Sequence, residues 1–115
     1  MKIVVSIDPV GEEGLIMISV KNVLYLEYEK SVNRVLVHTR YHRYFLPGPT
    51  KFWVTGLNNS GFFYRFVDRT NAVNLQNILQ IDKEQKNIIF KGTPKTCSIS
   101  RRMLKKIMDE FPLIK

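Results

Sequence analysis

The sequence predicts a mainly β fold, made of short and mostly antiparallel strands with one short mid-chain helix and one C-terminal helix. Two observations support this. Apolar and β-branched residues occur in short runs, and turn-forming residues separate these runs about every eight to twelve residues. Only two segments, 50–58 and 101–111, have the features of helices. With 115 residues, 44% of them hydrophobic, the chain is expected to form one domain over residues 1–115.

The strands are expected in short runs that recognisable turns separate. Segment 8–14 is rich in turn formers, so residues 1–14 hold either a first strand or an N-terminal extension. Residues 30–33 join two runs as a hairpin, and the Pro-Gly-Pro of residues 47–49 ends the next strand abruptly. Two polar loops divide the last runs. The expected strands are residues 1–7, 15–20, 23–28, 34–39, 41–46, 62–67, 72–81, 88–90 and 96–99.

The two helices differ in how strongly the sequence specifies them. In residues 50–58, Thr50 is the expected N-cap, but β-branched residues and Gly56 make the helix intrinsically weak. It is expected to form because it can bury Phe52, Trp53 and Leu57. Residues 101–111 are a stronger helix with Ser100 as N-cap. Its core-facing arc comprises Met103, Leu104, Ile107, Met108 and Phe111.

The charge of the chain is unevenly distributed. The formal net charge is +8, of which residues 1–29 contribute −3 and residues 30–115 contribute +11. The basic character therefore belongs to the body of the fold, as a surface that binds a polyanion would require. An ordinary solvated basic surface would have the same net charge, so both interpretations stay open.

Enzymatic and metal-binding functions find no support in the sequence. Cys97 is the only cysteine, which leaves no partner for an intrachain disulfide, and it is expected to be a small buried thiol on a strand. His38 and His42 would share one face of a strand, but no carboxylate or cysteine beside them completes a metal site. No catalytic or phosphate-loop motif is recognisable. We expect no enzyme activity, no metal, no cofactor and no small-molecule substrate.

Membrane insertion and secretion are also not indicated. No apolar run approaches the roughly 18–20 residues that a membrane-spanning helix needs. The first apolar residues lead directly to Ser6 and Asp8, unlike the apolar region of a signal peptide. A cytoplasmic protein is therefore expected.

Two arginines begin the C-terminal helix. Arg101 and Arg102 lie in its first turn, where the positive end of the helix dipole disfavours a cation. Helical phase places Arg102 almost opposite the apolar arc. An arginine becomes useful there if a phosphate binds at the same helix end, and its fork matches O6 and N7 of guanine. Contact between Arg102 and nucleic acid is therefore favoured over a merely solvated arginine.

The polar segment 68–71 allows two interpretations. It lies between two expected strands, so Asp68 or Thr70 can simply stabilise a turn by bonding to local backbone. Alternatively, Asp68 orients Arg69 toward a phosphate or a groove edge. Asn74 is expected to be structural and to bond the backbone near a bend of its strand.

These residues together resemble a known family. The Ala-Val-Asn-Leu of residues 72–75, Ile78 after it, the following pair of short strands, and the Ser-Arg-Arg of residues 100–102 resemble the LytTR family of bacterial DNA-binding domains. The Val-Leu-Tyr-Leu-Glu of residues 23–27 and the weak helix before Gly61 extend the resemblance, which covers roughly residues 15–111. It implies an elongated, mainly β domain that binds double-stranded DNA, with loops entering successive major grooves. The family is the output domain of many two-component response regulators.

The resemblance also implies which residues contact DNA. Arg102 matches the principal base-reading arginine, and Asn33 falls on or beside a second base contact, where some members have histidine. Arg69 matches a third contact, and Arg101 lies beside Arg102. Many members have Arg-x-His-Arg-Ser where this chain has residues 66–70, so the usual first arginine and the histidine are absent. The candidate phosphate contacts are Lys30, Arg34, Lys105 and Lys106.

Other readings of function and organisation remain. Residues 1–14 are too few for a receiver domain, so the chain is expected to be a stand-alone regulator or an output domain alone. The family relation implies paired repeat sites on DNA and a possible homodimer bound to them. A module for single-stranded nucleic acid would instead use aromatic side chains as stacking platforms. A protein-interaction domain would use the basic surface for an acidic partner.

Overall fold

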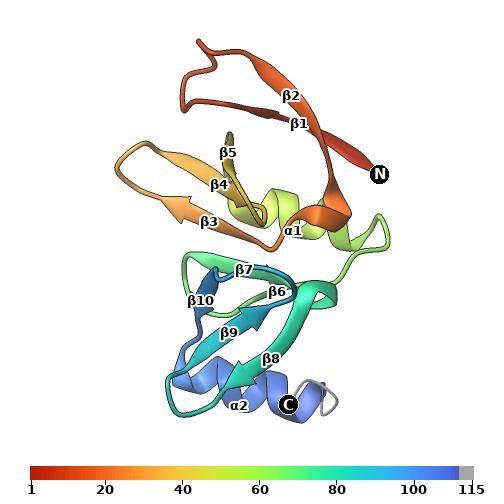
Figure 1. Cartoon of the computed structure of the whole chain (residues 1–115), viewed down its shortest axis with the longest axis vertical. Coiled ribbons are helices and arrows are strands. Elements are labelled where there is room, and N and C mark those ends of the chain that lie inside the picture. Colours follow the sequence, from red (N-terminus) through yellow and green to blue (C-terminus); the bar gives the residue numbers. More distant parts are fainter. Residues whose placement is uncertain (112–115) are drawn as a thin grey trace.

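The computed structural model describes residues 1–111 and shows two antiparallel sheets, one above the other, in an elongated molecule (Figure 1). The extents along the principal axes are 41, 29 and 26 Å. The predicted mainly β fold with two helices is thereby confirmed. The elements are β1 (Lys2–Ser6), β2 (Leu15–Ser19), the 3-10 turn η1 (Val20–Asn22), β3 (Tyr25–Glu29), β4 (Arg34–His38), β5 (Arg43–Leu46), α1 (Thr50–Asn58), β6 (Tyr64–Phe66), β7 (Asn71–Asn74), the 3-10 turn η2 (Leu75–Asn77), β8 (Ile78–Asp82), β9 (Asn87–Phe90), β10 (Thr96–Ser98) and α2 (Arg101–Glu110).

Each sheet has its own hydrophobic core and its own helix. The larger sheet has the strand order β2-β1-β5-β4-β3-β7-β6, and its core includes Leu26, Val37 and, from α1, Leu57. The smaller sheet has the order β10-β9-β8, and its core includes Ile88 and, from α2, Ile107. The two layers therefore place α2 at the end of the molecule farthest from the β1–β2 hairpin (Figure 1).

The first helix forms where the sequence predicts, but two details of the prediction are wrong. Pro49 occupies the N-cap position and Thr50 is the first helical residue, with its side chain buried. Phe52 is 64% exposed rather than buried. Helical phase explains this, because Thr50, Val54 and Leu57 share the face that meets the sheet and Phe52 lies on another face.

The second helix confirms its predicted cap and core face. The Oγ of Ser100 accepts a hydrogen bond from the Met103 N–H over 3.3 Å. Ile107 is fully buried, and the four other predicted apolar residues pack against the same core while half-buried. Burying this face of the helix stabilises it far more than its intrinsic propensity does.

The predicted strand over residues 72–81 is in fact two strands joined by η2. Asn74 ends β7, and its side-chain oxygen accepts a hydrogen bond from the Gln76 N–H over 3.3 Å, which caps the 3-10 turn. The Asn74 amide nitrogen donates to the Val23 carbonyl oxygen over 3.0 Å. The chain thus leaves the larger sheet after β7 and begins the smaller sheet at β8. The prediction that Asn74 is structural and lies at a bend is confirmed.

The two histidines do not share a strand. His38 is the last residue of β4 and is buried, whereas His42 is exposed and precedes β5, which begins at Arg43. The expected shared face of one strand is therefore wrong, because a turn at residues 39–42 separates them. Within residues 1–111, no group of three His, Cys, Asp or Glu side chains is placed to hold a metal ion.

We expect the Asn74→Ala substitution to lower the free energy of unfolding by about 1–3 kcal/mol, because it removes a buried side chain that donates to the Val23 carbonyl oxygen and accepts from the Gln76 N–H. The measurement is urea unfolding followed by circular dichroism. Gln76→Ala is the matched control, since the Gln76 side chain is exposed and the backbone N–H that Asn74 binds is retained. Equal effects of the two substitutions would contradict the structural role assigned to Asn74.

Candidate nucleic-acid interface

Three segments far apart in the sequence meet on one side of the molecule. One groove is lined by residues that include Asn33 and Arg69, and a second groove by residues that include Arg69 and Arg102. Phe66 and Arg69 line both grooves, so the two are adjacent. The tip of the β3–β4 hairpin and the start of α2 lie on this side (Figure 1). We call the surface formed by Asn33, Phe66, Arg69 and Arg102 the loop face.

Asn33 is held in a defined conformation at the tip of the β3–β4 hairpin. Its backbone φ angle is 51°, a left-handed conformation that asparagine tolerates better than most residues. The Tyr28 hydroxyl donates a hydrogen bond to the Asn33 Oδ1 over 2.7 Å. The Asn33 side chain is therefore oriented before any ligand binds, and its Nδ2 remains available as a donor.

The structure ties Arg34 to its surroundings more firmly than the other basic candidates. Its Nε donates to the Pro9 carbonyl oxygen over 2.9 Å, and its Nη1 donates to the Asn33 carbonyl oxygen over 2.8 Å. Arg34 thus links the β1–β2 loop to the hairpin that carries Asn33. Lys30 in the same hairpin is exposed.

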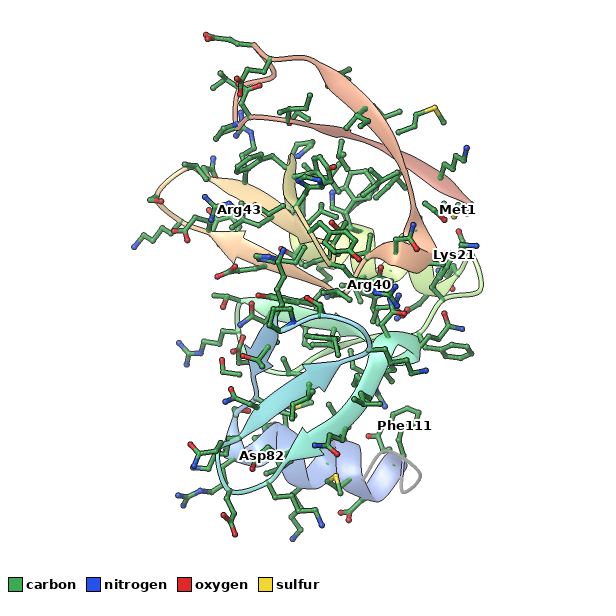
Figure 2. The ribbon with its side chains drawn as sticks, in the orientation of Figure 1. Met1, Lys21, Arg40, Arg43, Asp82 and Phe111 are labelled. Atoms are coloured by element: carbon green, nitrogen blue, oxygen red, sulfur yellow. The ribbon has the colours of Figure 1, made fainter. Side chains whose placement is uncertain are left out.

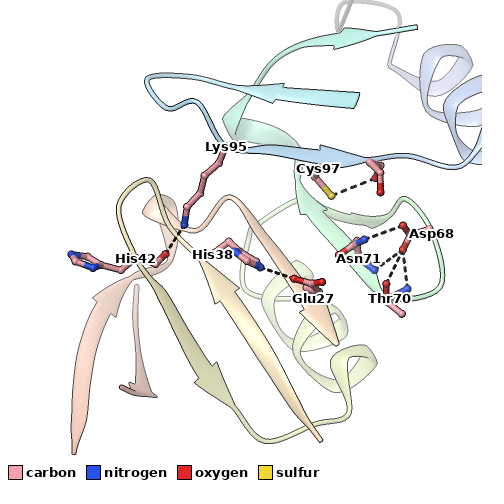
Figure 3. Close-up of polar contacts among 9 residues, drawn as sticks. Glu27, His38, His42, Asp68, Thr70, Asn71, Lys95 and Cys97 are labelled. Carbon is pink, nitrogen blue, oxygen red and sulfur yellow. Dashed lines mark hydrogen bonds and ion pairs between the residues drawn. The ribbon is translucent and has the colours of Figure 1, made fainter. Parts of the chain in front are cut away.

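The turn before β7 is an Asx turn built by Asp68 (Figure 3). The Asp68 Oδ1 accepts from the backbone N–H groups of Thr70 and Asn71, each over 2.8 Å. Its Oδ2 accepts from the Asn71 Nδ2 over 2.9 Å. The predicted turn is confirmed. In the described residues the Asp68 carboxylate bonds Thr70 and Asn71 rather than Arg69, so it shapes the loop from which the exposed Arg69 extends.

The start of α2 is anchored to the same turn. The Ser100 N–H donates to the Val67 carbonyl oxygen over 3.0 Å. Arg101 and Arg102 follow directly and are both exposed, as are Lys105 and Lys106 one turn later. The backbone bond fixes where Arg102 lies relative to the turn that carries Arg69.

A partly buried polar cluster lies where the two sheets meet, and sequence reasoning did not anticipate it (Figure 3). The His38 Nε2 lies 2.8 Å from the Glu27 Oε1. The His38 ring stacks on Tyr25 at a centroid distance of 4.1 Å, and Tyr25 stacks in turn on Phe90 of the smaller sheet at 5.7 Å. The Lys95 Nζ donates to the His42 carbonyl oxygen over 2.9 Å. The cluster therefore joins both sheets.

The electrostatics of this cluster favour a neutral imidazole. Burial lowers the pKa of His38 below its usual value. The hydrogen bond to Glu27 raises this pKa, but by less than burial lowers it, and the charges of Lys95 and Arg43 lower it further. A neutral ring donates its Nε2 proton to the Glu27 carboxylate. Burial, together with the nearby Arg43, also lowers the pKa of Lys95.

Cys97 is the buried strand thiol that the sequence predicts. It lies in β10 with 3% of its surface exposed. Burial raises its pKa to about 12, with smaller contributions from Asp68 and Glu27. The thiolate is the reactive form of cysteine, so this side chain serves packing rather than chemistry.

The comparisons with known proteins agree with this arrangement. A family model for the LytTr DNA-binding domain matches residues 13–111. The chain belongs to the LytTR family. Its structure is similar to the LytTr DNA-binding domain of a putative methyl-accepting/DNA response regulator from Bacillus cereus, with 14% sequence identity, a TM-score of 0.72 and 94% of each chain covered. At this identity the likeness shows the fold alone. No curated protein matches the chain.

Membership of the LytTR family confirms the resemblance seen in the sequence and identifies the chain as a DNA-binding domain of the kind found in bacterial response regulators. No helix within residues 1–111 is long and apolar enough to cross a membrane.

The loop face of this LytTR domain brings together Asn33, Arg69 and Arg102. Sequence reasoning missed Tyr28, Lys51 and Phe66, which line the same grooves. They come from β3, α1 and β6, which only the folded chain brings together.

We expect the free energy of unfolding to fall as the pH is lowered from about 7 toward 5, because the pKa of His38 is lower in the folded chain. Below the unfolded pKa of about 6.5, the unfolded chain binds a proton that the folded chain does not, with a slope of up to about 1.4 kcal/mol per pH unit. Urea unfolding at several pH values measures this slope.

His38→Gln should flatten that pH dependence, since glutamine still donates to Glu27 but does not titrate. His42→Gln is the matched control, because this histidine is exposed. An unchanged slope in the His38→Gln variant would show that another group causes the pH dependence.

Proposed function

We propose that this LytTR domain recognises specific sequences in double-stranded DNA through its loop face, as a bacterial transcriptional regulator acting in the cytoplasm. Asn33 and Arg102 read base edges in the major groove, and Arg69 and Arg101 contact bases or phosphates. Lys30, Lys105 and Lys106 set the register of the protein on the phosphates. Arg34 acts mainly through its two backbone bonds, which fix the hairpin.

The observation that carries this proposal is the convergence of Asn33, Arg69 and Arg102 on one continuous surface. The three residues come from separate loops of the chain, yet adjacent grooves connect them. Base reading needs donors and acceptors held on a rigid support. Each of the three loops has such a support: the Tyr28 hydroxyl, the Asp68 turn and the Ser100 anchor.

The dimensions of the domain suit contact with successive grooves. Its longest extent is 41 Å, and one turn of B-DNA is about 34–36 Å long. The β3–β4 hairpin belongs to the larger sheet and α2 packs on the smaller sheet, so Asn33 and Arg102 are separated along the molecule (Figure 1). We propose that the two side chains address major-groove segments about one helical turn apart. Paired repeat sites would each bind one domain, with a homodimer possible on such DNA.

Arg102→Ala is expected to lower the affinity for a selected duplex by about 1–3 kcal/mol and to relax the base preference at one position. Fluorescence anisotropy with selected and random duplexes measures both effects. Lys91→Ala is the matched control, because Lys91 is exposed and its Nζ lies beside the Gln76 carbonyl oxygen of η2, outside both grooves of the loop face. Unchanged affinity and unchanged base preference in Arg102→Ala would refute the assigned role.

Lys105→Ala is expected to weaken binding to selected and random duplexes by the same factor. Loss of one phosphate contact should also reduce the slope of log affinity against log salt concentration by about one unit. A salt titration with both duplexes and a single-stranded oligonucleotide tests this. Equal or tighter binding of the single strand would favour a stacking module instead, and absence of any salt-dependent binding would favour a protein partner.

A further inference from the structure

The β1–β2 hairpin at the far end of the molecule presents an unprotected sheet edge. β2 is the terminal strand of the larger sheet and pairs with β1 alone. Its sequence, Leu-Ile-Met-Ile-Ser, contains no charge and no proline, and its register with β1 is continuous without a bulge. Natural proteins usually protect a sheet edge with a charged residue, a proline or a bulge, because a free row of N–H and C=O groups is a template for another strand.

The other terminal strands of the two sheets in residues 1–111 all carry protection. β6 has three residues, and its Arg65 pairs with Glu110. β8 contains a register shift near Ile78 and ends in Asp82. β10 also has only three residues. The open edge of β2 is therefore a particular feature of this strand and not a general property of the fold.

One face of the hairpin is apolar and exposed. Met17 lies opposite Val4 in the β1–β2 pair, so both side chains point to the same face. Leu15 lies on this face as well, and the exposed fractions are 69% for Leu15, 61% for Met17 and 49% for Val4. Pairing along the edge would cover part of this surface in addition to satisfying the backbone.

We infer that β2 pairs antiparallel with β2 of a second copy of this chain, about a two-fold axis at Met17. The hydrogen bonds from Ile7 N–H to Gly14 and from Val20 N–H to Met1 fix which residues face β1. By alternation, Leu15, Met17 and Ser19 direct their N–H and C=O groups to the free edge. The axis at Met17 aligns these outward groups with one another: Met17 faces Met17, and Leu15 faces Ser19 of the other copy.

Charge complementarity indicates that the strand pairing with β2 belongs to a second copy of this chain. In the register centred on Met17, the loop residue Glu13, two positions before β2, approaches Lys21 of the other copy, two positions after β2, and the symmetry repeats this pair. Both side chains are exposed. Glu13 belongs to a loop ordered by Asp8, whose carboxylate accepts the Glu13 N–H over 2.8 Å. Lys21 lies at the other end of the hairpin, beside Met1 (Figure 2).

This self-pairing leaves the loop face free. The hairpin and α2 lie at opposite ends of the long axis (Figure 1), so a copy paired at β2 does not cover Arg102. A two-fold axis makes the two DNA-binding surfaces of such a dimer run in opposite directions. The inference does not rest on the proposed DNA contacts, because it uses the residues of the hairpin and η1 alone.

Sedimentation velocity on the full chain over a range of concentrations tests the inference. A reversible monomer–dimer equilibrium is expected, and Met17→Lys should raise its dissociation constant at least tenfold by placing two like charges on the axis. Leu79→Lys is the matched control, since Leu79 is 57% exposed on another edge strand, β8. Circular dichroism and thermal unfolding establish that each variant is folded. A chain that stays monomeric, or a dimer that both variants weaken equally, would overturn the inference.

Charge reversal tests the register itself. Glu13→Lys and Lys21→Glu should each raise the dissociation constant several-fold, because each disrupts two symmetric ion pairs in the dimer. The double variant should restore the dimer to near the original strength. Additive weakening in the double variant would refute the register centred on Met17. Binding of a single-site duplex by Met17→Lys separates this outcome from any failure of DNA recognition.

Discussion

The geometry of this domain depends on two side-chain amides, one buried and one half-buried, that join its two sheets. The side-chain amides of Asn74 and Asn77 both donate to the Val23 carbonyl oxygen, over 3.0 and 2.7 Å. The Asn74 N–H also donates to the Leu24 carbonyl oxygen over 3.0 Å. These bonds hold the end of one sheet against the start of the other. Because Asn33 belongs to the first layer and Arg102 to the second, their relative position depends on this junction.

The loop face is supported by bonds that exist without a ligand. A loop that is already ordered loses less conformational entropy on binding, and more of the interaction energy then appears as affinity. The Asp68 carboxylate has a double effect here. It places an acidic group beside a surface proposed to meet phosphates, but its hydrogen bonds from Thr70 and Asn71 stabilise the charge locally. The loop gains order while its anionic group stays engaged with its own backbone.

Local patterns determined what could be predicted from the sequence. The strands, both helices, the Ser100 cap and the Asp68 turn follow from periodicity and from bonds that span few residues. The break at η2, the His38–Glu27 pair and the two bonds of Arg34 depend on partners that the fold brings together. Phe52 was assigned to the core because it is large and apolar, although helical phase favours Val54. Residue type alone does not determine which face of a short helix is buried.

The departures from the family motif change how charge is distributed over the loop face. Where many LytTR domains are expected to have arginine and histidine, this chain has Phe66 and Asp68. Phe66 is half-buried and lines both grooves, so it provides an apolar floor between the hairpin and α2. Arg69 is then the cation that the loop supplies. Under the proposed function, the attraction to phosphates falls mainly on the first turns of α2, where Arg101, Arg102, Lys105 and Lys106 are all exposed. Since those cations oppose the helix dipole, a bound phosphate would relieve an unfavourable interaction that the free domain retains.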